Sequence, residues 1–388
     1  MTQSAIAMVW HGGADFRAQR VTLPELRAGE ARVELEAATV CGSDRHSVSG
    51  RRSAACPSVL GHEGVGRIIA SSGMRAVDGT LLRPDQRVVF GVTATCGECD
   101  RCRAGLTAKC RHVLKVGHER FVDSGRGEPW SLSGTYASHI HLRAGVAAVP
   151  VPEDLPAATA ATAGCAVATV MAMMEQAGRG CAGFRNGTGQ CDGAKLGGKR
   201  VLVTGLGLLG LVAVAVAVRE GAASVYVSDL NPARVELARR LGAVEVGEGM
   251  PPNADVALEL SGATTAVEQC IHSVDVGGTV VLAGSVAPAG EVSVDPEAIV
   301  RGWLTVTGVH NYEPRHLQQA VDFLVADYRE GVRVDSGGGV GETLHGIASQ
   351  VVSAPTPLAE LAGVFAEDSQ YLRTVVDCRA LPAVVAGD

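Results

Sequence analysis

Apolar and polar residues follow two different patterns along the chain. From about residue 32 to residue 149, short runs rich in apolar and β-branched residues are separated by Gly, Pro and polar turns. The clearest of these runs are ARVELEAATV, GVGRIIAS, QRVVFGV and YASHIHL. Runs of this kind are typical of strands joined by turns. The first part of the chain is therefore predicted to be irregular and mostly β.

The pattern changes beyond Pro156. The segment ATAATAGCAVATVMAMMEQA is rich in Ala and Met, which predicts a helix. From Lys199 onward, strand-like runs alternate with helix-like ones: RVLVTG, LLGLVAVAVAVREG, SVYVSD, PARVELARRLGA, ADVALELSG, TAVEQCIHSV and GTVVLAGS. Such alternation predicts βαβ units and a parallel sheet. Two helix-like segments, HLQQAVDFLVADYREG and LAELAGVFAE, follow before the chain ends.

Length and composition narrow the class of protein. With 388 residues, 46% apolar and 19% charged, the chain is expected to fold as a globular protein of two domains. The net charge of −7 and the lack of a long basic run argue against a nucleic-acid partner. The N-terminal residues lack a signal-peptide pattern, and 11 cysteines are too sparse for a disulfide scaffold, so a cytoplasmic location is expected.

Two segments allow more than one interpretation. Residues 201–218 form an uncharged run close to the length of a membrane span, but their glycines favour a buried strand, turn and helix, with no membrane contact. The glycine-dense segment from Gly178 to Gly198 is predicted to be an inserted surface loop. Its Cys181 and Cys191 are expected to be thiols, with a disulfide or a third metal site as the alternative.

A group of cysteines has metal-binding spacing. Cys96, Cys99, Cys102 and Cys110 follow the pattern C-x2-C-x2-C-x7-C. Thiolates two residues apart can point at one centre from a single loop, and a structural zinc takes four such ligands. This loop is therefore predicted to bind a structural Zn²⁺.

A second metal site is predicted upstream. Cys41 and the pair His62-Glu63 supply only a few nitrogen and sulfur donors. So small a set suits a zinc ion that keeps one coordination position for water or substrate. A catalytic zinc is therefore expected beside the structural one.

The sequence GLGLLG, from Gly205 through Gly207, Leu208 and Leu209 to Gly210, follows an apolar strand and opens a helix. In this context the glycines allow a tight turn, the approach of a diphosphate and close packing of helix on strand. The helix N-terminus offers free N–H groups to the diphosphate. A dinucleotide site is therefore predicted.

The type of dinucleotide depends on the end of the next strand. Asp229 follows SVYVS about twenty residues after the last glycine, where a carboxylate binds the ribose 2′-hydroxyl and repels a 2′-phosphate. NAD is therefore favoured over NADP. The alternative is that Asp229 caps the helix that begins near Asn231. Arg234 either reaches the same ribose or is solvated.

Taken together, CGSDRH, LGHEGVG, the four-cysteine loop, AGCAVAT and VTGLGLLG resemble the zinc-dependent medium-chain alcohol dehydrogenase family over nearly the whole chain. The resemblance implies an α/β fold with two domains. Residues 1–166 and 312–388 would form a chaperonin-10-like, β-rich catalytic domain. Residues 167–311 would form a Rossmann domain with a doubly wound parallel sheet.

The resemblance also implies roles for individual residues. Cys41, His62 and Cys165 would be the three protein ligands of the catalytic zinc, although Cys165 alone is also typical of a small core residue. Glu63 would lie next to that metal. Asp44 would hold the second ring nitrogen of His62.

Three further residues match positions that act on substrate or cofactor in the family. Ser43 would bond the substrate oxygen, His46 would relay a proton to solvent, and Thr169 would contact the nicotinamide. A lone histidine at position 46 is equally typical of a protein surface. The remaining histidines, His118 among them, have no spacing that indicates ligation.

The implied reaction interconverts an alcohol and its aldehyde or ketone by hydride transfer to NAD. Zinc would lower the pKa of the substrate hydroxyl, and Ser43 and His46 would move its proton. Arg51 and Arg52, with PSVLGHE and GVHNYEP, resemble a branch associated with phosphonate metabolism. These arginines would bind a phosphonate or carboxylate, or they belong to a solvated loop.

Other classes of function stay open at this stage. A zinc-free quinone-reductase-type enzyme of the same superfamily would not need three metal ligands. A catalytically silent NAD-binding sensor or structural protein is a further alternative, because a fold does not guarantee chemistry. Family members commonly assemble through the Rossmann sheet, so a homodimer or homotetramer is expected, with residues 293–309 at the interface.

Overall fold

The computed structural model describes residues 4–122, 130–179, 196–246, 253–286, 290–330, 332–334, 340–366 and 371–383. Cys181 and Cys191 lie outside these ranges. The chain forms two compact units. The first unit contains residues 1–168, 311–325 and 348–388, and the second contains residues 169–310 and 326–347.

The unit boundaries at residues 168/169 and 310/311 lie close to those predicted at 166/167 and 311/312. Residues 326–347 differ, because they were expected in the first domain and belong to the second unit. There, the Asp327 carboxylate accepts hydrogen bonds from the N–H groups of Leu344 at 3.1 Å and His345 at 2.8 Å. Arg240 also pairs with Glu342 at 2.6 Å. Such contacts between distant segments leave no trace in local sequence pattern.

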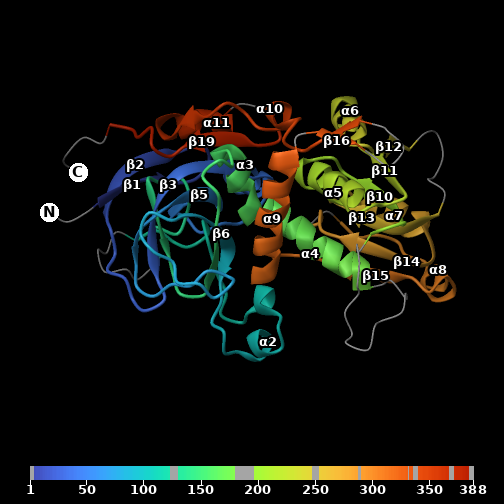
Figure 1. The fold of residues 1–388 in the computed structure, drawn as a ribbon. Helices are drawn as coiled ribbons and strands as arrows, with labels where there is room; N and C mark the ends of the chain where they lie inside the picture. The colour runs from blue at the N-terminus through green and yellow to red at the C-terminus, as the bar shows by residue number, and fades with distance from the viewer. Residues whose placement is uncertain are drawn as a thin grey trace. The chain divides into compact units, whose positions relative to one another are not determined.

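The first unit is built mostly on antiparallel strands, with β18 and β19 as a parallel pair (Figure 1). One sheet has the strand order β18-β19-β3-β5-β6-β7, with β8 paired to β3 and β9 to β6, and a second has the order β2-β1-β4. The bounds are β1 Ser4–Trp10, β2 Phe16–Thr22, β3 Ala31–Val40, β4 Ser58–Val59, β5 Glu63–Ser71, β6 Arg87–Ala94, β7 Leu114–Lys115, β8 His139–Leu142, β9 Val146–Pro150, β18 Thr356–Pro357 and β19 Thr374–Asp377.

Strand β3 changes character along its length. Val33 and Leu35 are buried with exposed Glu34 between them, as expected of a strand with one face in the core. The pairing with β5 shifts between Leu35 and Ala37, and the last four residues of β3 are all buried. A bulge of this kind bends a strand and re-aims its side chains. The chain consequently enters the interior just before Cys41.

The helix predicted beyond Pro156 is broken. It consists of α3 Ala157–Ala161, the 3-10 turn η2 Thr162–Gly164 and α4 Ala166–Arg179, with Cys165 in a non-helical conformation between them. A Cβ atom at Gly164 would lie 2.5 Å from the carbonyl oxygen of Phe90, so only glycine permits this approach to β6. Local composition favours a continuous helix, and packing against β6 overrides it.

Short helices complete the first unit. They are α1 Gly42–Val48, α2 Asp100–Arg103, the 3-10 turn η1 Thr107–Lys109, α10 Ala348–Val351, the 3-10 turn η3 Leu358–Glu360 and α11 Leu361–Ala366. Helix α9, Pro314–Glu330, begins in the first unit and ends in the second.

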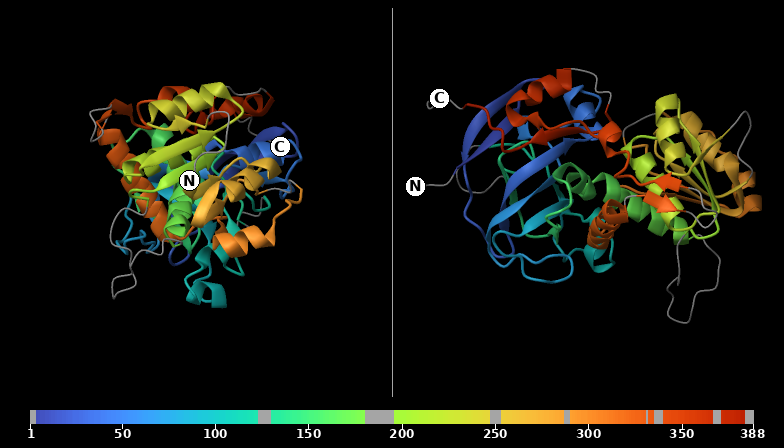
Figure 2. Two further views of the ribbon diagram at one scale, coloured as in Figure 1. Left: turned by 90° about the vertical axis from the view of Figure 1, so that its right-hand side faces the viewer. Right: turned by 45° about the horizontal axis from the view of Figure 1, so that its top comes forward.

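The second unit contains a six-stranded parallel sheet of order β12-β11-β10-β13-β14-β15, with helices against it (Figures 1 and 2). From β10 the chain adds β11 and β12 on one side, and it then adds β13, β14 and β15 on the other. This strand order is that of a doubly wound nucleotide-binding fold. The bounds are β10 Arg200–Thr204, β11 Ser224–Ser228, β12 Val244–Glu245, β13 Ala254–Glu259, β14 Val274–Leu282 and β15 Thr305–Gly308, with helices α5 Leu208–Arg219, α6 Pro232–Arg240, α7 Thr264–Ser273 and α8 Pro296–Gly302. A separate hairpin pairs β16 Val332–Val334 with β17 Val340–Glu342.

The uncharged run from Val201 to Val218 forms β10, a turn and α5, as predicted, and most of its residues are buried. Across the described ranges, no single helix is long and apolar enough to cross a bilayer. One pair of segments, 157–164 and 166–178, meets the length and composition criteria only when taken together, and it is bent by 48°.

Candidate metal centres and cofactor site

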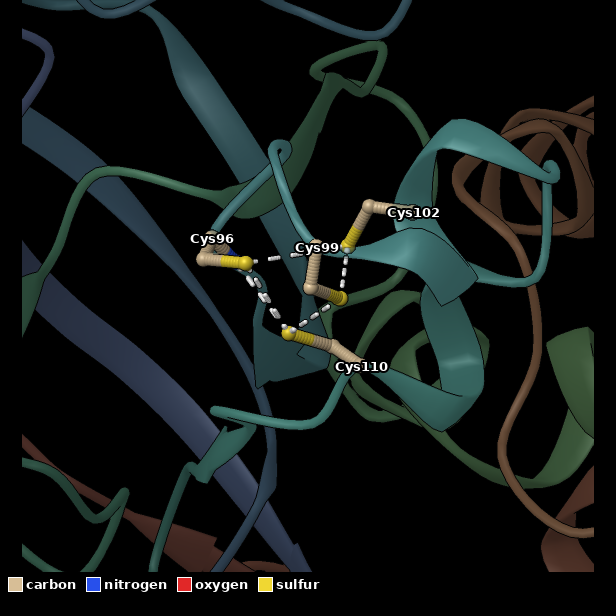
Figure 3. A group of neighbouring side chains, drawn as sticks. All are labelled: Cys96, Cys99, Cys102 and Cys110. Atoms are coloured by element: carbon tan, nitrogen blue, oxygen red, sulfur yellow. Dashed lines mark hydrogen bonds between the residues drawn. The ribbon is translucent and has the colours of Figure 1, made fainter.

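Four cysteine sulfurs gather in the loop that follows β6 (Figure 3). The Sγ–Sγ distances are 3.5 Å for Cys99–Cys102 and Cys96–Cys110, and 4.0 Å for Cys96–Cys102 and Cys99–Cys110. A tetrahedron of sulfurs with zinc bonds of about 2.3 Å has edges of about 3.8 Å. The predicted structural set therefore fits a tetrahedral zinc ion.

Local backbone geometry brings these sulfurs together. Cys99 is the N-cap of α2 and Cys102 lies within that helix, so one turn places both thiols on the same side. The N–H groups of Cys96 and His112 approach the Sγ of Cys110 at 3.4 and 3.3 Å. Donors of this kind stabilise a thiolate, which is the form that binds zinc.

Cys41, His62 and Cys165 form the second set, and their ligand atoms all lie within 4.8 Å of one another. Cys41 is the N-cap of α1, His62 directly precedes β5, and Cys165 lies at the break between η2 and α4. Cys41 is 8% exposed and His62 3% exposed. Two sulfurs and one imidazole leave a tetrahedral zinc one open position, which is typical of a catalytic site.

Asp44 supports the imidazole of His62. Its Oδ1 lies 3.3 Å from His62 Nδ1, within ion-pair distance but without hydrogen-bond geometry. Its Oδ2 accepts hydrogen bonds from the backbone N–H of Cys41 and from the hydroxyl of Tyr136, each at 3.0 Å. Asp44 was expected from the sequence, whereas Tyr136 was not. In the sequence, Tyr136 begins the strand-like run YASHIHL, which has no spacing that indicates a metal site.

A buried ion pair adjoins the same set. Glu63 is fully buried, and Arg373 donates to its carboxylate from Nε at 3.0 Å and from Nη2 at 3.4 Å. The same Nη2 lies 3.6 Å from the Sγ of Cys41. Burial raises the pKa of Glu63, and the guanidinium opposes that shift. A hydrogen bond with Cys165, and then the charge of Arg373, lower the pKa of Cys41 well below its usual range.

Strand register explains why Arg373 was missed by sequence reasoning. In the ladder between β19 and β3, Thr374 lies opposite Val40. One residue further, the same register brings Arg373 beside Cys41, although 332 positions separate them. No local motif encodes a pairing between strands so far apart.

Several side chains near the set are partly accessible. Ser43 Oγ lies 3.3 Å from Nε2 of His62, so its hydroxyl is close to the ligand cluster. His46 lies in the last turn of α1 and is partly exposed. The ring of His118, which carried no sequence signal, lies 5.4 Å from that of His62. Burial lowers the pKa of His118 to about 4.

Arg51 and Arg52 differ in their surroundings. Arg51 is exposed, whereas Arg52 is partly buried and its backbone N–H donates to the carbonyl of His46. After burial, the charge of Arg52 is the largest contribution that lowers the pKa of Lys115, and it also acts on His118. Arg52 therefore adds positive charge near Lys115 and His118.

The glycine-rich turn has the geometry expected of a dinucleotide site. Gly205 has φ of 85°, a conformation that favours glycine, and a Cβ there would lie 2.6 Å from the N of Ser261. A Cβ at Gly210 would lie 2.1 Å from the carbonyl oxygen of Gly205. Gly207, the N-cap of α5, faces open space within 4 Å, which suits the approach of a diphosphate.

Asp229 is tied to this turn. Its Oδ2 accepts a hydrogen bond from the N–H of Leu206 at 2.6 Å, and its Oδ1 accepts one from Asn231 at 2.8 Å. The alternative that Asp229 caps the next helix is wrong, because the N-cap of α6 is Asn231, whose side chain accepts from Ala233. The other residues expected at the cofactor are Leu208, buried at the start of α5, and the partly exposed Leu209, Arg234 and Thr169.

Comparisons with known proteins agree with this arrangement. The alcohol dehydrogenase GroES-like domain matches residues 27–153, and the zinc-binding dehydrogenase domain matches residues 209–326. An L-threonine 3-dehydrogenase from Anaeromyxobacter sp. strain Fw109-5 is 30% identical over 308 residues, which cover 75% of this chain and 79% of that one. Its counterpart from strain K is 29% identical over 357 residues, covering 84% and 93%.

The fold is also similar to that of solved structures. An alcohol dehydrogenase from Thermotoga maritima superposes with a TM-score of 0.77 at 25% identity, covering 97% of this chain and 99% of that one. Fold, ligand sets and matched domains define a zinc-binding dehydrogenase that uses a nicotinamide dinucleotide. The chain belongs to the zinc-dependent medium-chain alcohol dehydrogenase family, and it is an NAD(P)-linked alcohol dehydrogenase.

The two ligand sets predict which cysteine holds which ion. The Cys41→Ser and Cys99→Ser variants should each retain about one zinc per chain where the unaltered protein has two, because each removes one ligand from a different set. Only Cys41→Ser should abolish turnover while leaving dinucleotide binding intact. Metal analysis with dinucleotide titration measures both. Cys56→Ser, a thiol outside both sets, is the control. Full turnover by Cys41→Ser carrying two zinc ions would contradict the assignment.

Proposed function

We propose that this dehydrogenase oxidises a small hydroxy acid with NAD at the centre formed by Cys41, His62 and Cys165. The observation that carries the proposal is the convergence of their ligand atoms within 4.8 Å. These residues would hold a zinc ion, which would supply the positive charge that lowers the pKa of a substrate hydroxyl, and NAD would supply the hydride acceptor. The surrounding residues hold the ligands in position and move the released proton.

Two buried groups act on the ligands in this proposal. Asp44, itself fixed by Tyr136, orients the His62 ring so that Nε2 faces the metal position. Arg373 lies beside both Glu63 and the Cys41 sulfur, so its charge favours the thiolate form of Cys41. Glu63 balances that guanidinium and lies next to the metal set.

Proton transfer is assigned to the accessible side of the cluster. The Ser43 hydroxyl, close to His62 Nε2, accepts the substrate proton and passes it toward His46, which lies one helical turn further along α1 at its partly exposed end. Thr169 contacts the nicotinamide, and the turn from Gly205 to Gly210 binds the diphosphate. Asp229 and Arg234 adjoin the ribose in this proposal.

The names of the relatives and the positive charge near the ligand cluster together indicate the class of substrate. The relatives described above are named for L-threonine, a secondary alcohol that carries a carboxylate. Arg52 adds positive charge near His118, whose ring lies 5.4 Å from that of the ligand His62. A carboxylate is therefore preferred over the phosphonate suggested by sequence, and the exposed Arg51 is assigned to the outer rim of the site.

Two alternatives make different predictions. A zinc-free reductase has no use for the convergent set of two sulfurs and one imidazole, and a silent NAD-binding protein would bind dinucleotide without turnover.

Free thiols and metal ligands both suit a reducing compartment, so a cytoplasmic location is proposed.

Assembly through the edge of the parallel sheet is also proposed. Strand β15 ends the sheet, and exposed apolar side chains surround it: Val276 at 74%, Val300 at 78%, Trp303 at 83% and Val306 at 38%. An unpaired edge with apolar neighbours favours pairing with a second copy. A homodimer through β15 buries these side chains, and a homotetramer is two such dimers.

A substrate panel tests the proposed reaction. The zinc-loaded protein should form NADH with L-threonine, 3-hydroxybutyrate and 1,3-butanediol, at a higher kcat/KM for the two acids, because cations adjoin the site. If the protein binds dinucleotide but forms no NADH from any alcohol, the result would favour the silent NAD-binding protein. Turnover that persists in protein containing only the structural zinc would favour the zinc-free class.

Cofactor choice tests the role of Asp229. Asp229→Asn keeps an acceptor for the N–H of Leu206 but removes the charge that repels a 2′-phosphate. The NAD/NADP ratio of kcat/KM should fall about tenfold, and NADPH, followed by fluorescence titration, should bind more tightly. Asp295→Asn, at the N-cap of α8, is the matched control. An unchanged ratio would remove Asp229 from the specificity determinants.

Edge pairing can be tested at both ends of one sheet. Val306→Lys on β15 should shift the sedimenting species from dimer or tetramer toward smaller forms, because a charge on the paired edge opposes association. Val244→Lys lies on β12, the opposite edge, where the side chain is 54% exposed, and it should leave the mass unchanged. Equal masses for the two variants, or a monomeric unaltered protein, would argue against the β15 interface.

A further inference from the structure

The segment after the four-cysteine loop runs directly against the catalytic ligand set. Strand β7 pairs with the end of β6, where Thr93 lies opposite Lys115. A Cβ at Gly117 would lie 2.2 Å from the carbonyl oxygen of Gly61, the residue before His62. The next residue, His118, brings its ring to 5.4 Å from that of His62. Backbone packing thus holds the segment that contains Lys115 against the residues at and before His62.

The side chain of Lys115 points away from the hydrophobic core. Its neighbours Leu114 and Val116 both contact that core, and side chains alternate along an extended segment. Lys115 is partly buried, and its electrostatic neighbours are Arg52, Lys109 and the metal ligand Cys165. The ammonium therefore lies on the face of the segment opposite the core, and it interacts electrostatically with the ligand Cys165.

The charges around Lys115 do not balance. Among the residues that the structure describes, neither Lys115 nor Arg52 makes a side-chain ion pair with an acid. Two acids of the ligand region are engaged elsewhere, because Asp44 supports His62 and Glu63 pairs with Arg373. The Glu119 carboxylate accepts from the backbone N–H of Lys115, and among the described residues no ion pair joins it to the Lys115 ammonium. Like charges held together with partial loss of solvent are unfavourable, and an anionic ligand would relieve that repulsion.

We propose that Lys115, with Arg52 beside it, binds the carboxylate of the substrate while the substrate hydroxyl lies at the Cys41–His62–Cys165 centre. The inference rests on the proposed function and adds to it a specificity-determining residue outside every motif of the sequence. Lys115 binds as a point charge at the partly buried inner position, and Arg52 strengthens the positive potential. Neutral alcohols of the same size make no use of either group.

Two substrates with the same carbon skeleton test this proposal, because one carries a carboxylate where the other carries a neutral hydroxymethyl group. Lys115→Met should lower kcat/KM for 3-hydroxybutyrate at least about tenfold, because it removes a hydrogen bond between two charged groups. The value for 1,3-butanediol should change less than about twofold. Lys115→Arg should recover much of the loss on the acid, because the positive charge returns. Lys199→Met, the same change in the second unit, is the control.

A binding measurement separates this inference from the reaction itself. Butyrate, which lacks the hydroxyl, should bind the zinc-loaded protein in calorimetry and lose that binding in Lys115→Met. Equal butyrate affinity in both proteins, or equal loss on both substrates, overturns the role of Lys115. Much tighter binding of propylphosphonate than of butyrate overturns the carboxylate assignment. A protein that binds butyrate through Lys115 but oxidises neither alcohol overturns the proposed function alone.

Discussion

Backbone pairing of β3 with two different strands is the constraint on which the catalytic centre depends. On one side, Thr39 lies opposite Glu63 of β5, which delivers His62 to the end of β3. On the other side, Val40 lies opposite Thr374 of β19, which delivers Arg373. A shift of one residue in either ladder would turn these side chains to the opposite face. The hydrogen bonds of a sheet therefore set the positions of a metal ligand, a carboxylate and a guanidinium at once.

Burial strengthens the ion pairs and hydrogen bonds around the metal set, and it also requires each buried charge to have a partner. Glu63 and Arg373 are nearly inaccessible, and a charge in such a position is tolerated only with a partner. The same holds for Asp44, which is 1% exposed and accepts bonds from Cys41 and Tyr136. Each acid near the metal set is thus already engaged within the protein. Positive charge at Lys115 and Arg52 is left without such a balance among the described residues, and this asymmetry points to an anionic substrate.

In the second unit, one carboxylate contributes both to the glycine-rich turn and to the expected ribose site. Backbone geometry at Gly205 and Gly210 brings helix α5 close to β10, and Asp229 holds the turn by accepting from Leu206. The carboxylate expected to select the ribose thus also maintains the loop that binds the diphosphate. Its substitution by a residue that cannot accept this hydrogen bond would disturb both properties, so the two roles separate only in the amide variant.

The sequence by itself determined whatever depends on short separations along the chain. The cysteine spacing from Cys96 to Cys110, the glycine-rich turn after a strand and the alternation of strands and helices each encode a local geometry, and the structure has all of them. Tertiary structure alone decided the break at Cys165, the transfer of residues 326–347 to the second unit, and the arrival of Tyr136, Arg373, His118 and Lys115 at the catalytic ligands. Those outcomes depend on the register between distant strands and on close packing such as Gly164 against Phe90. Neither register nor packing has a local signature, because each arises only when separate parts of the chain meet.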